Sequence, residues 1–318
     1  MVDGQFSFHY DTNQLTDNLW RFNPDTIVDI SVKEHGTSFI CGNILTKQYK
    51  EETIAHKIIK KKCSKQIDNL YKQKVNPYWG EEKRKKIVNS LKKKMETPFK
   101  IKYGEVTSSR GVIKNQYINK KVGSGFYSKD IWSEYGKIIF PYIPKGITIY
   151  GEIVGYVTGT STMIQKGYDY GCKVGENMLM IYRITHTDDC GNHIEWNVQE
   201  VYDWTIDLLN KYPSLKNRIK PISILYHGSL KNLYPELEIN EHWQENILKN
   251  LSEDKNFGME MNEPMCKMKS PREGVVIRIE NDIKPEAFKL KTIAFKMKEA
   301  KSVDAGNIDI EMKDSYVK

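Results

Sequence analysis

The stretch DISVKEHGTSFI, residues 29–40, decides the fold prediction for this chain. Its first residues alternate as in a half-buried strand, and Lys33 takes the last step before a polar turn at Gly36. A lysine normally lies on the solvated rim of a strand. One that is placed against a turn of backbone amides can instead act as a nucleophile, so other parts of the chain must decide between these two interpretations.

The bulk composition predicts a globular protein. The chain has 318 residues, 39% of them hydrophobic, with a mean hydropathy of −0.60, which allows one large domain or two small ones. No apolar run of about 18 residues occurs, so we expect no membrane span, and the N-terminus lacks signal-peptide architecture. The five cysteines form no CxxC pair. We therefore expect a reduced, cytoplasmic protein (host cytoplasm if the chain is viral).

The positive charge is concentrated in one segment. Residues 47–102 carry 17 lysines and Arg84 against six acids, a net charge of +12, whereas the whole chain carries +8. This segment predicts a basic helical insert, with a break at 76–82 and a second helix starting at Glu81–Glu82. A locally basic surface indicates a polyanion partner, so we expect the insert to bind a nucleic-acid backbone. A solvated lysine-rich helix face is the alternative.

Strand and helix signals alternate along the remaining sequence. We expect two strands within 26–46 joined by a turn at 34–37, and short strands and turns over 101–160. Further strands are expected at 177–187, 222–230, 273–280 and 287–295, with a hairpin turn at 188–193 and helices at 198–212 and 241–254. This mixture predicts an α+β fold of antiparallel sheets flanked by helices, in a single domain over 1–318.

Four other stretches carry residues suited to chemistry: SSR with Arg110, YGE with Glu152, EGVVIR with Glu273, and KLK with Lys289 and Lys291. Each has a purely structural explanation when taken alone: a turn arginine, a salt-bridged edge residue, an acid at a strand start and the wet face of an amphipathic strand.

Strand geometry favours a functional interpretation of the KLK stretch over a purely structural one. Side chains at i and i+2 project together, so Lys289 and Lys291 share one face while Phe288 and Leu290 take the other. Two adjacent ammonium groups repel each other unless an anion lies between them, and a triphosphate supplies such an anion. One chemistry then joins the pieces: the amine of Lys33, kept partly neutral by neighbouring cations, attacks the α-phosphate of a nucleotide.

This set, in this chain order, resembles the covalent nucleotidyltransferase superfamily of polynucleotide ligases and mRNA capping enzymes, and more narrowly its RNA ligase 2-like branch. The first motif of the superfamily usually reads Lys-x-Asp-Gly, and here His35 takes the Asp position, a form typical of RNA ligases of this branch. The resemblance extends from FHYDT (8–12) to GNIDIE (306–311). The stretches that carry it are KEHGTS (33–38), SSR (108–110), YGE (150–152), MIYRI (180–184), EGVVIR (273–278) and KLK (289–291).

The resemblance implies an ATP-grasp-like nucleotidyltransferase fold and an ATP-dependent RNA ligase, which joins a 3′-OH to a 5′-phosphate RNA end. AMP would be carried first on Lys33 and then on the RNA. Lys33, Lys289 and Lys291 would be catalytic, and Glu152 and Glu273 would hold Mg²⁺ (or Mn²⁺) through its waters. The residues implied to contact the nucleotide are Glu34, His35, Gly36, Ser38, Arg110, Glu152, Tyr182, Glu273, Lys289 and Lys291.

Ligases of this family usually carry an accessory domain, often an OB fold. Only 32 residues precede Lys33 and 27 follow Lys291, so no OB domain is apparent. Either the accessory module has been removed from the chain, or the protein manages without one.

Two alternative functions stay open: a DNA ligase or GTP-using capping enzyme, and an inactive relative that only binds RNA. His35 argues against the first, and retention of Lys33 with both carboxylates and both KLK lysines argues against the second. No zinc site is expected, because the nearby cysteines and histidines lack finger spacing. The group in question is Cys172, His186, Asp188, Cys190 and His193.

Overall fold

The computed structural model describes residues 2–9, 12–50, 52–72, 80–96, 99–114, 127, 129–259, 261–280 and 285–304. Tyr10 and Asp11 of the FHYDT stretch and the whole GNIDIE stretch lie outside these ranges. The chain divides into two compact units, Met1–Val2 with Leu45–Tyr103, and Asp3–Ile44 with Gly104–Lys318. The expected insert at 47–102 falls within the first unit.

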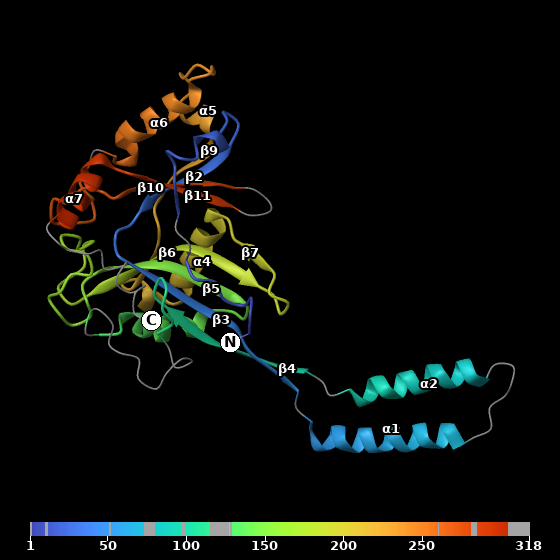
Figure 1. The fold of residues 1–318 in the computed structure, drawn as a ribbon. Helices are drawn as coiled ribbons and strands as arrows, with labels where there is room; N and C mark the ends of the chain where they lie inside the picture. Colours follow the sequence, from blue (N-terminus) through green and yellow to red (C-terminus); the bar gives the residue numbers. More distant parts are fainter. Residues whose placement is uncertain are drawn as a thin grey trace. The chain divides into compact units, whose positions relative to one another are not determined.

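The larger unit is built on two β-sheets (Figure 1). One sheet has the order β1-β11-β10-β2-β9, and the other has the order β4-β3-β5-β6-β7 with β8 beside β6. The strands of the first sheet are β1 (Asn13–Gln14), β2 (Ile27–Lys33), β9 (Ile224–Ser229), β10 (Gly274–Ile279) and β11 (Glu286–Lys291). Those of the second are β3 (Thr37–Lys50), β4 (Phe99–Ser108), β5 (Ile147–Gly155), β6 (Asn177–Thr187), β7 (His193–Glu195) and β8 (Ile219–Pro221).

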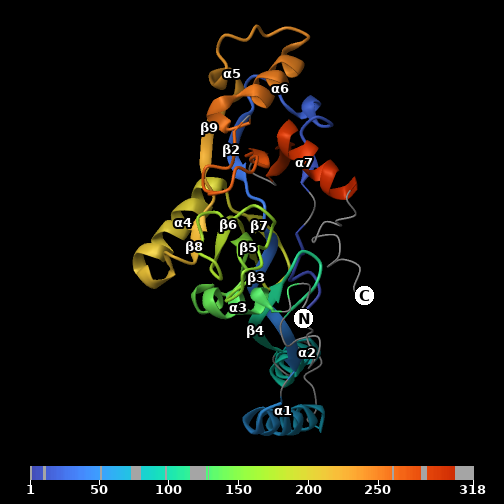
Figure 2. The ribbon, with the colours of Figure 1, turned by 90° about the vertical axis from the view of Figure 1, so that its left-hand side faces the viewer.

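Helices flank both sheets. They are α3 (Ile131–Ile139), α4 (Val198–Lys211), α5 (Leu230–Leu233), α6 (Trp243–Glu253) and α7 (Ile293–Asp304), with 3₁₀ turns η1 (Leu19–Arg21), η2 (Phe140–Tyr142), η3 (Pro213–Leu215) and η4 (Lys255–Phe257). Figure 2 shows α4 running beside β6 and β8. Two sheets flanked by helices confirm the predicted α+β fold class.

Each sheet packs one apolar face against helices, and the second sheet also buries Val154, Met178 and Met180 on its other face. In the first sheet the apolar residues, such as Ile30, Ile277 and Leu290, form a core with α5 and α6. In the second sheet the apolar residues, such as Phe39 and Ile149, form a core with α3 and α4. Full burial of an Ile, Leu or Phe side chain contributes about 1.5–3 kcal/mol, so these two faces fix the register of the strands. The opposite face of the first sheet carries Lys33, Lys289 and Lys291.

Two parts of the secondary-structure prediction were wrong. The segment 101–160, expected to hold strands and turns, contains α3, whose N-terminus is capped by Asp130 through the Ser133 N–H at 2.9 Å. The strand expected over 287–295 ends at Lys291, because the Thr292 hydroxyl accepts the Phe295 N–H at 3.1 Å and starts α7.

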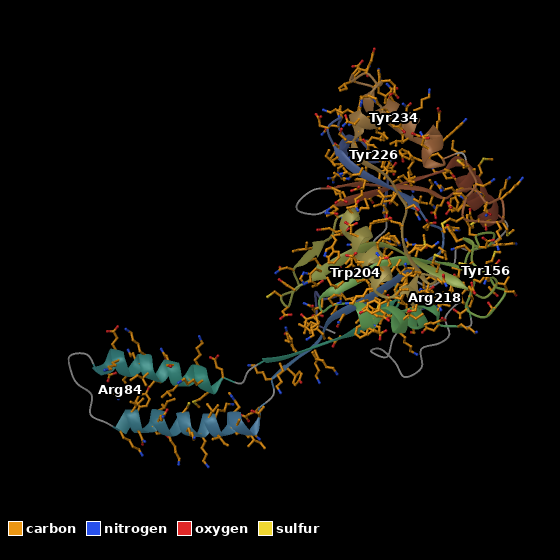
Figure 3. The ribbon with its side chains drawn as sticks, turned by 180° about the vertical axis from the view of Figure 1, so that it is seen from behind. Arg84, Tyr156, Trp204, Arg218, Tyr226 and Tyr234 are labelled. Atoms are coloured by element: carbon orange, nitrogen blue, oxygen red, sulfur yellow. The ribbon has the colours of Figure 1, made fainter. Side chains whose placement is uncertain are left out.

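The smaller unit is a helical hairpin. Helices α1 (Ile54–Lys72) and α2 (Gly80–Met95) lie side by side and bury His56 and Cys63 from one helix and Val88 and Leu91 from the other. The two basic helices and the start of the second near Glu81 confirm the prediction, while 76–79 lie outside the described residues. Arg84 lies over the Tyr71 ring, 5.6 Å from its centroid (Figure 3). No helix in the described part of the chain is long and apolar enough to span a membrane.

Candidate active site

Strand register brings the three candidate lysines together. Gly274 of β10 pairs with Lys33 of β2 on one side and with Lys291 of β11 on the other, and the next row on this face joins Ser31 and Lys289 through Val276. Paired residues of neighbouring antiparallel strands share a face, so all three lysines project to the same side. Gly274 has φ +153°, and a Cβ there would lie 2.0 Å from the Leu290 carbonyl oxygen, so this row requires glycine.

A single buried carboxylate organises the end of this sheet. Glu273, whose side chain is 4% exposed, lies 2.8 Å from Lys33 Nζ, 3.3 Å from His35 Nδ1 and 3.8 Å from Lys291 Nζ. Burial by itself would raise the pKa of Glu273, but Lys33 and His35 together lower it to about 2. The carboxylate is therefore charged at neutral pH and holds the candidate nucleophile in place.

The turn after Lys33 is fixed from several directions. The Gly36 N–H donates to Glu152 Oε1 at 3.1 Å, and the Gly36 carbonyl accepts from Gln165 Nε2 at 2.8 Å. A Cβ on Gly36 would lie 2.3 Å from the Ile153 carbonyl oxygen, so only glycine lets the turn approach β5 this closely. The His35 N–H donates to the Tyr170 hydroxyl at 2.6 Å.

Glu34 places its carboxyl in a buried cluster behind this turn. Burial, followed by repulsion from Glu263, raises the pKa of Glu34 to about 8, while Arg272 and the Tyr170 hydroxyl act in the opposite direction. Tyr170 itself has φ +48°, the one positive φ among the described residues that are not glycine. The sequence predicts that Glu34 contacts the nucleotide. In the structure Glu34 lines a cavity that Lys33 and Tyr182 also line.

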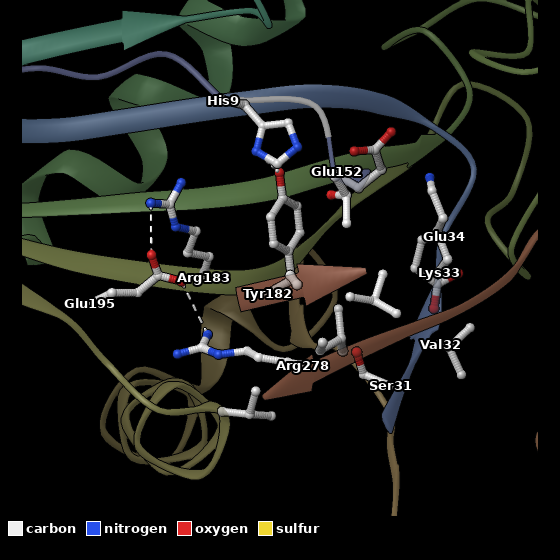
Figure 4. Close-up of a pocket in the computed structure, with 15 residues that line it drawn as sticks. His9, Ser31, Val32, Lys33, Glu34, Glu152, Tyr182, Arg183, Glu195 and Arg278 are labelled. Carbon is white, nitrogen blue, oxygen red and sulfur yellow. Dashed lines mark hydrogen bonds and ion pairs between the residues drawn. The ribbon is translucent and has the colours of Figure 1, made fainter. Parts of the chain in front are cut away.

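A cavity of about 110 Å³ is lined by residues of both sheets (Figure 4). Among the predicted residues, Lys33, Glu34, Glu152 and Tyr182 line it. The Tyr182 ring projects from β6, and its hydroxyl lies 3.3 Å from His9 Nδ1. The cavity thus places the Tyr182 ring in the same hollow as Lys33.

His9 also contributes to the electrostatics of this hollow. Burial first, and then the positive charges of Arg183, Arg110, Lys33 and Lys289, lower the pKa of His9 to about 3. His9 is therefore neutral at physiological pH, and Arg110, Lys33 and Lys289 all act on it.

The other predicted residues lie around the cavity without lining it. Ser38 pairs with Glu152 in the register of β3 and β5, and its carbonyl accepts from Trp132 Nε1 at 2.9 Å. Lys291 Nζ contacts both carboxylate oxygens of Glu299 in α7, at 2.8 and 3.0 Å. Burial, followed by the charges of Lys33, Lys291 and Arg110, lowers the pKa of Lys289.

The two predicted metal ligands approach the same turn from different sheets. Glu152 accepts from Gly36, and Glu273 pairs with Lys33 and His35. Among the described residues, no group of three or more His, Cys, Asp or Glu side chains could hold a metal ion. Mg²⁺ often binds through one or two carboxylates plus substrate phosphates, so the oxygen chemistry of this pair fits that ion.

Several cavity residues were missed from the sequence. Arg183 and Arg278 both pair with Glu195, at 2.8 and 3.3 Å, and connect the two sheets through it (Figure 4). Arg278 could have been predicted from the sequence, because strand alternation places it on the same face of β10 as Gly274 and Val276. Arg183 could not, because a β-bulge between Tyr150 and Gly151 turns it toward the cavity beside Tyr182.

Comparison with known proteins gives similarity to solved structures that include several of an RNA ligase. No protein-family model matches the sequence, and no curated protein matches it. The chain is similar to an RNA ligase from Naegleria gruberi with PPi, with 14% identity, a TM-score of 0.47, and coverage of 94% of this chain and 60% of that chain. Substituted variants of that ligase with AMP and Mn, and with ATP and Mn, match with 12% and 13% identity and a TM-score of 0.44 each. They cover 93% and 94% of this chain, which spans 59% and 60% of their length.

Replacing the central carboxylate should destabilise the fold in a pH-dependent way. Since its pKa falls from 4.5 to about 2 on folding, Glu273 contributes stability above pH 4.5 that is lost as the pH falls toward 2. We expect Glu273→Gln to lower the free energy of unfolding at pH 7 by roughly 3 kcal/mol, and by less at pH 3. Urea unfolding measures both values. Glu286→Gln, which removes an exposed pair with Arg21, is the control and should cost under about 1 kcal/mol. Equal losses for both variants would contradict this role.

Glu34 should show the opposite pH dependence. Its folded pKa of about 8 exceeds the ordinary 4.5, so the folded state keeps a proton that the unfolded state loses, and stability falls as the pH rises from 4.5 to 8. We expect Glu34→Gln, which cannot ionise, to be more stable than the unmodified protein at pH 8 and similar to it near pH 5. Chemical unfolding at the two pH values tests this, with the exposed Glu238→Gln as a control that should change neither. A Glu34→Gln protein that is less stable at pH 8 would show that the carboxyl is charged in the fold.

Proposed function

We propose that this protein is an ATP-dependent RNA ligase that joins 3′-OH and 5′-phosphate ends. The observation that carries the proposal is the Lys33–Gly274–Lys291 row, with Glu273 bound to the candidate nucleophile and the Tyr182 cavity beside it. This arrangement offers an amine, a cluster of cations and an aromatic ring around one small hollow. These are the groups needed to receive a nucleoside triphosphate and to accept its nucleotidyl group.

In the first step the Lys33 amine attacks the α-phosphorus of ATP. The N–P bond forms as the P–O bond to the β-phosphate breaks, and pyrophosphate leaves. Lys33 must first leave the ion pair with Glu273 and release a proton to solvent. Glu273 is not the base in this step, because a carboxylate with a pKa of about 2 is a very weak proton acceptor. Its role is to position the amine.

The remaining groups bind the nucleotide. Lys289 and Lys291 contact the phosphates, and Glu299 orients Lys291 from α7. Mg²⁺, held by Glu152 and Glu273, would neutralise phosphate charge when bound. The Tyr182 ring stacks on adenine, with its hydroxyl oriented by His9. The AMP then passes to a 5′-phosphate on RNA, and attack by the 3′-OH joins the ends and releases AMP.

The decisive test is covalent labelling. On incubation with ATP and Mg²⁺ the protein should gain the mass of one AMP, and peptide mapping should place it on Lys33. Lys33→Ala and Lys33→Arg should both abolish labelling, since a guanidinium stays protonated, while the exposed Lys249→Ala should label normally. AMP on another residue would overturn the assignment of the nucleophile. Nicked duplexes with RNA or DNA on each side then identify the strand that is sealed.

The two lysines of β11 should each be essential for this labelling. We expect Lys289→Ala or Lys291→Ala to reduce self-adenylylation by at least about 100-fold, the scale for removing one preorganised charge contact. Glu299→Gln, which leaves Lys291 in place without its anchor, should cost less than Lys291→Ala. Rates of AMP incorporation are compared after circular dichroism has verified folding. Near-normal labelling in both alanine variants would mean that these lysines form an ordinary solvated face.

A further inference from the structure

The helical hairpin carries a hollow of its own, which is shallow and open to solvent. Its volume is about 450 Å³, and it lies along α1 and includes Met95 at the end of α2. Four of the side chains that line it are lysines of α1, namely Lys57, Lys60, Lys61 and Lys65. This concentration of like charge in one hollow is unfavourable in isolation, because lysines four residues apart on a helix repel each other.

The local acid Glu52 offsets part of this charge, chiefly that of Lys60 and to a lesser degree that of Lys57. Glu52 pairs with Lys60 at 2.7 Å, and among the described residues no ion pair joins an acid to Lys57, Lys61 or Lys65. These three lysines are exposed, and their i, i+4, i+8 spacing places them on one helical face. His56 and Cys63 occupy the buried side of the same helix. We call Lys57, Lys61 and Lys65 the α1 lysine face.

The spacing of this face selects its partner. Eight residues of helix rise about 12 Å, the axial distance over which one strand of a duplex presents three to four phosphates. The residues that line the hollow include no aromatic side chain on which a base could stack, so a single strand gains nothing there beyond its charge. The ammonium groups of three flexible lysines can contact phosphates, but they do not distinguish one base sequence from another.

We propose that the α1 lysine face binds the phosphate backbone of a nucleic-acid duplex without sequence preference. The inference rests on the proposed function only for the identity of that duplex, as the RNA that flanks the break to be sealed. Binding itself requires neither ATP nor Lys33, which separates the two proposals experimentally.

The test compares two triple variants of the full chain. Lys57→Gln, Lys61→Gln and Lys65→Gln together remove the α1 lysine face, while glutamine keeps the helix propensity. Lys83→Gln, Lys85→Gln and Lys86→Gln together make the same charge change on exposed positions of α2. Fluorescence anisotropy measures the affinity for a random-sequence RNA duplex over a range of KCl concentrations, without ATP. The slope of log K against log salt should become shallower by about 2–3 for the α1 triple and by less than about 1 for the α2 triple.

Three outcomes would overturn the inference: an unchanged slope for the α1 triple, equal flattening by both triples, or displacement of the duplex by polyglutamate at equal charge concentration. Equal flattening would show that the duplex responds to the total charge of the hairpin and not to one face. Displacement by polyglutamate would show that the face binds any polyanion. AMP loading is measured on the same preparations. If AMP loading is normal and the salt slope of the α1 triple is unchanged, the α1 lysine face does not bind the duplex and the ligase proposal stands. If the salt slope is shallower but no AMP is loaded, the α1 lysine face stands and the ligase proposal fails.

Discussion

The candidate site depends on the burial of one charged carboxylate. A buried ion is costly unless it is paired, so Glu273 requires partners close to it, and the Lys33 ammonium and the His35 ring supply them from the next strand and its turn. That requirement ties β10 to the end of β2, and the glycine that follows Glu273 lets β11 approach on the other side. Charge pairing therefore places the amine, while the apolar cores behind the two sheets keep the strands in register.

Two acids that flank the same lysine have opposite protonation states. Glu273 and Glu34 are both buried, so desolvation raises the pKa of each. The contacts of Glu273 with Lys33 and His35 outweigh this effect, whereas Glu34 has the acid Glu263 as a neighbour. Glu34 therefore keeps its proton at neutral pH, and only one of the two acids contributes negative charge beside Lys33. Sequence position alone could not distinguish them, because the difference comes from the contacts of Glu273 with Lys33 and His35 and from Glu263 beside Glu34, residues that folding brings together.

The parts of the molecule that follow a local period could be predicted from the sequence. Alternation placed Lys289 and Lys291 on one face opposite Phe288 and Leu290, and charge density located the two basic helices. Features that interrupt the strand alternation or the helical repeat were not predicted. A bulge turns adjacent residues Tyr182 and Arg183 toward the same cavity. His9 comes from a segment without periodicity, and the short apolar run of α3 resembles a strand when its Asp130 cap is overlooked. The predicted roles of the site residues stay predictions until AMP labelling tests them.

The Arg183–Glu195–Arg278 bridge has a mechanical consequence. Its arginines belong to different sheets, and all three side chains are at most 12% exposed, so little water is available to replace a broken pair. The bridge therefore works as a spacer that presets the separation of the two sheets at that end of the cavity. Under the proposed function, the width of the cavity beside Tyr182 would limit the thickness of the ring that could enter it.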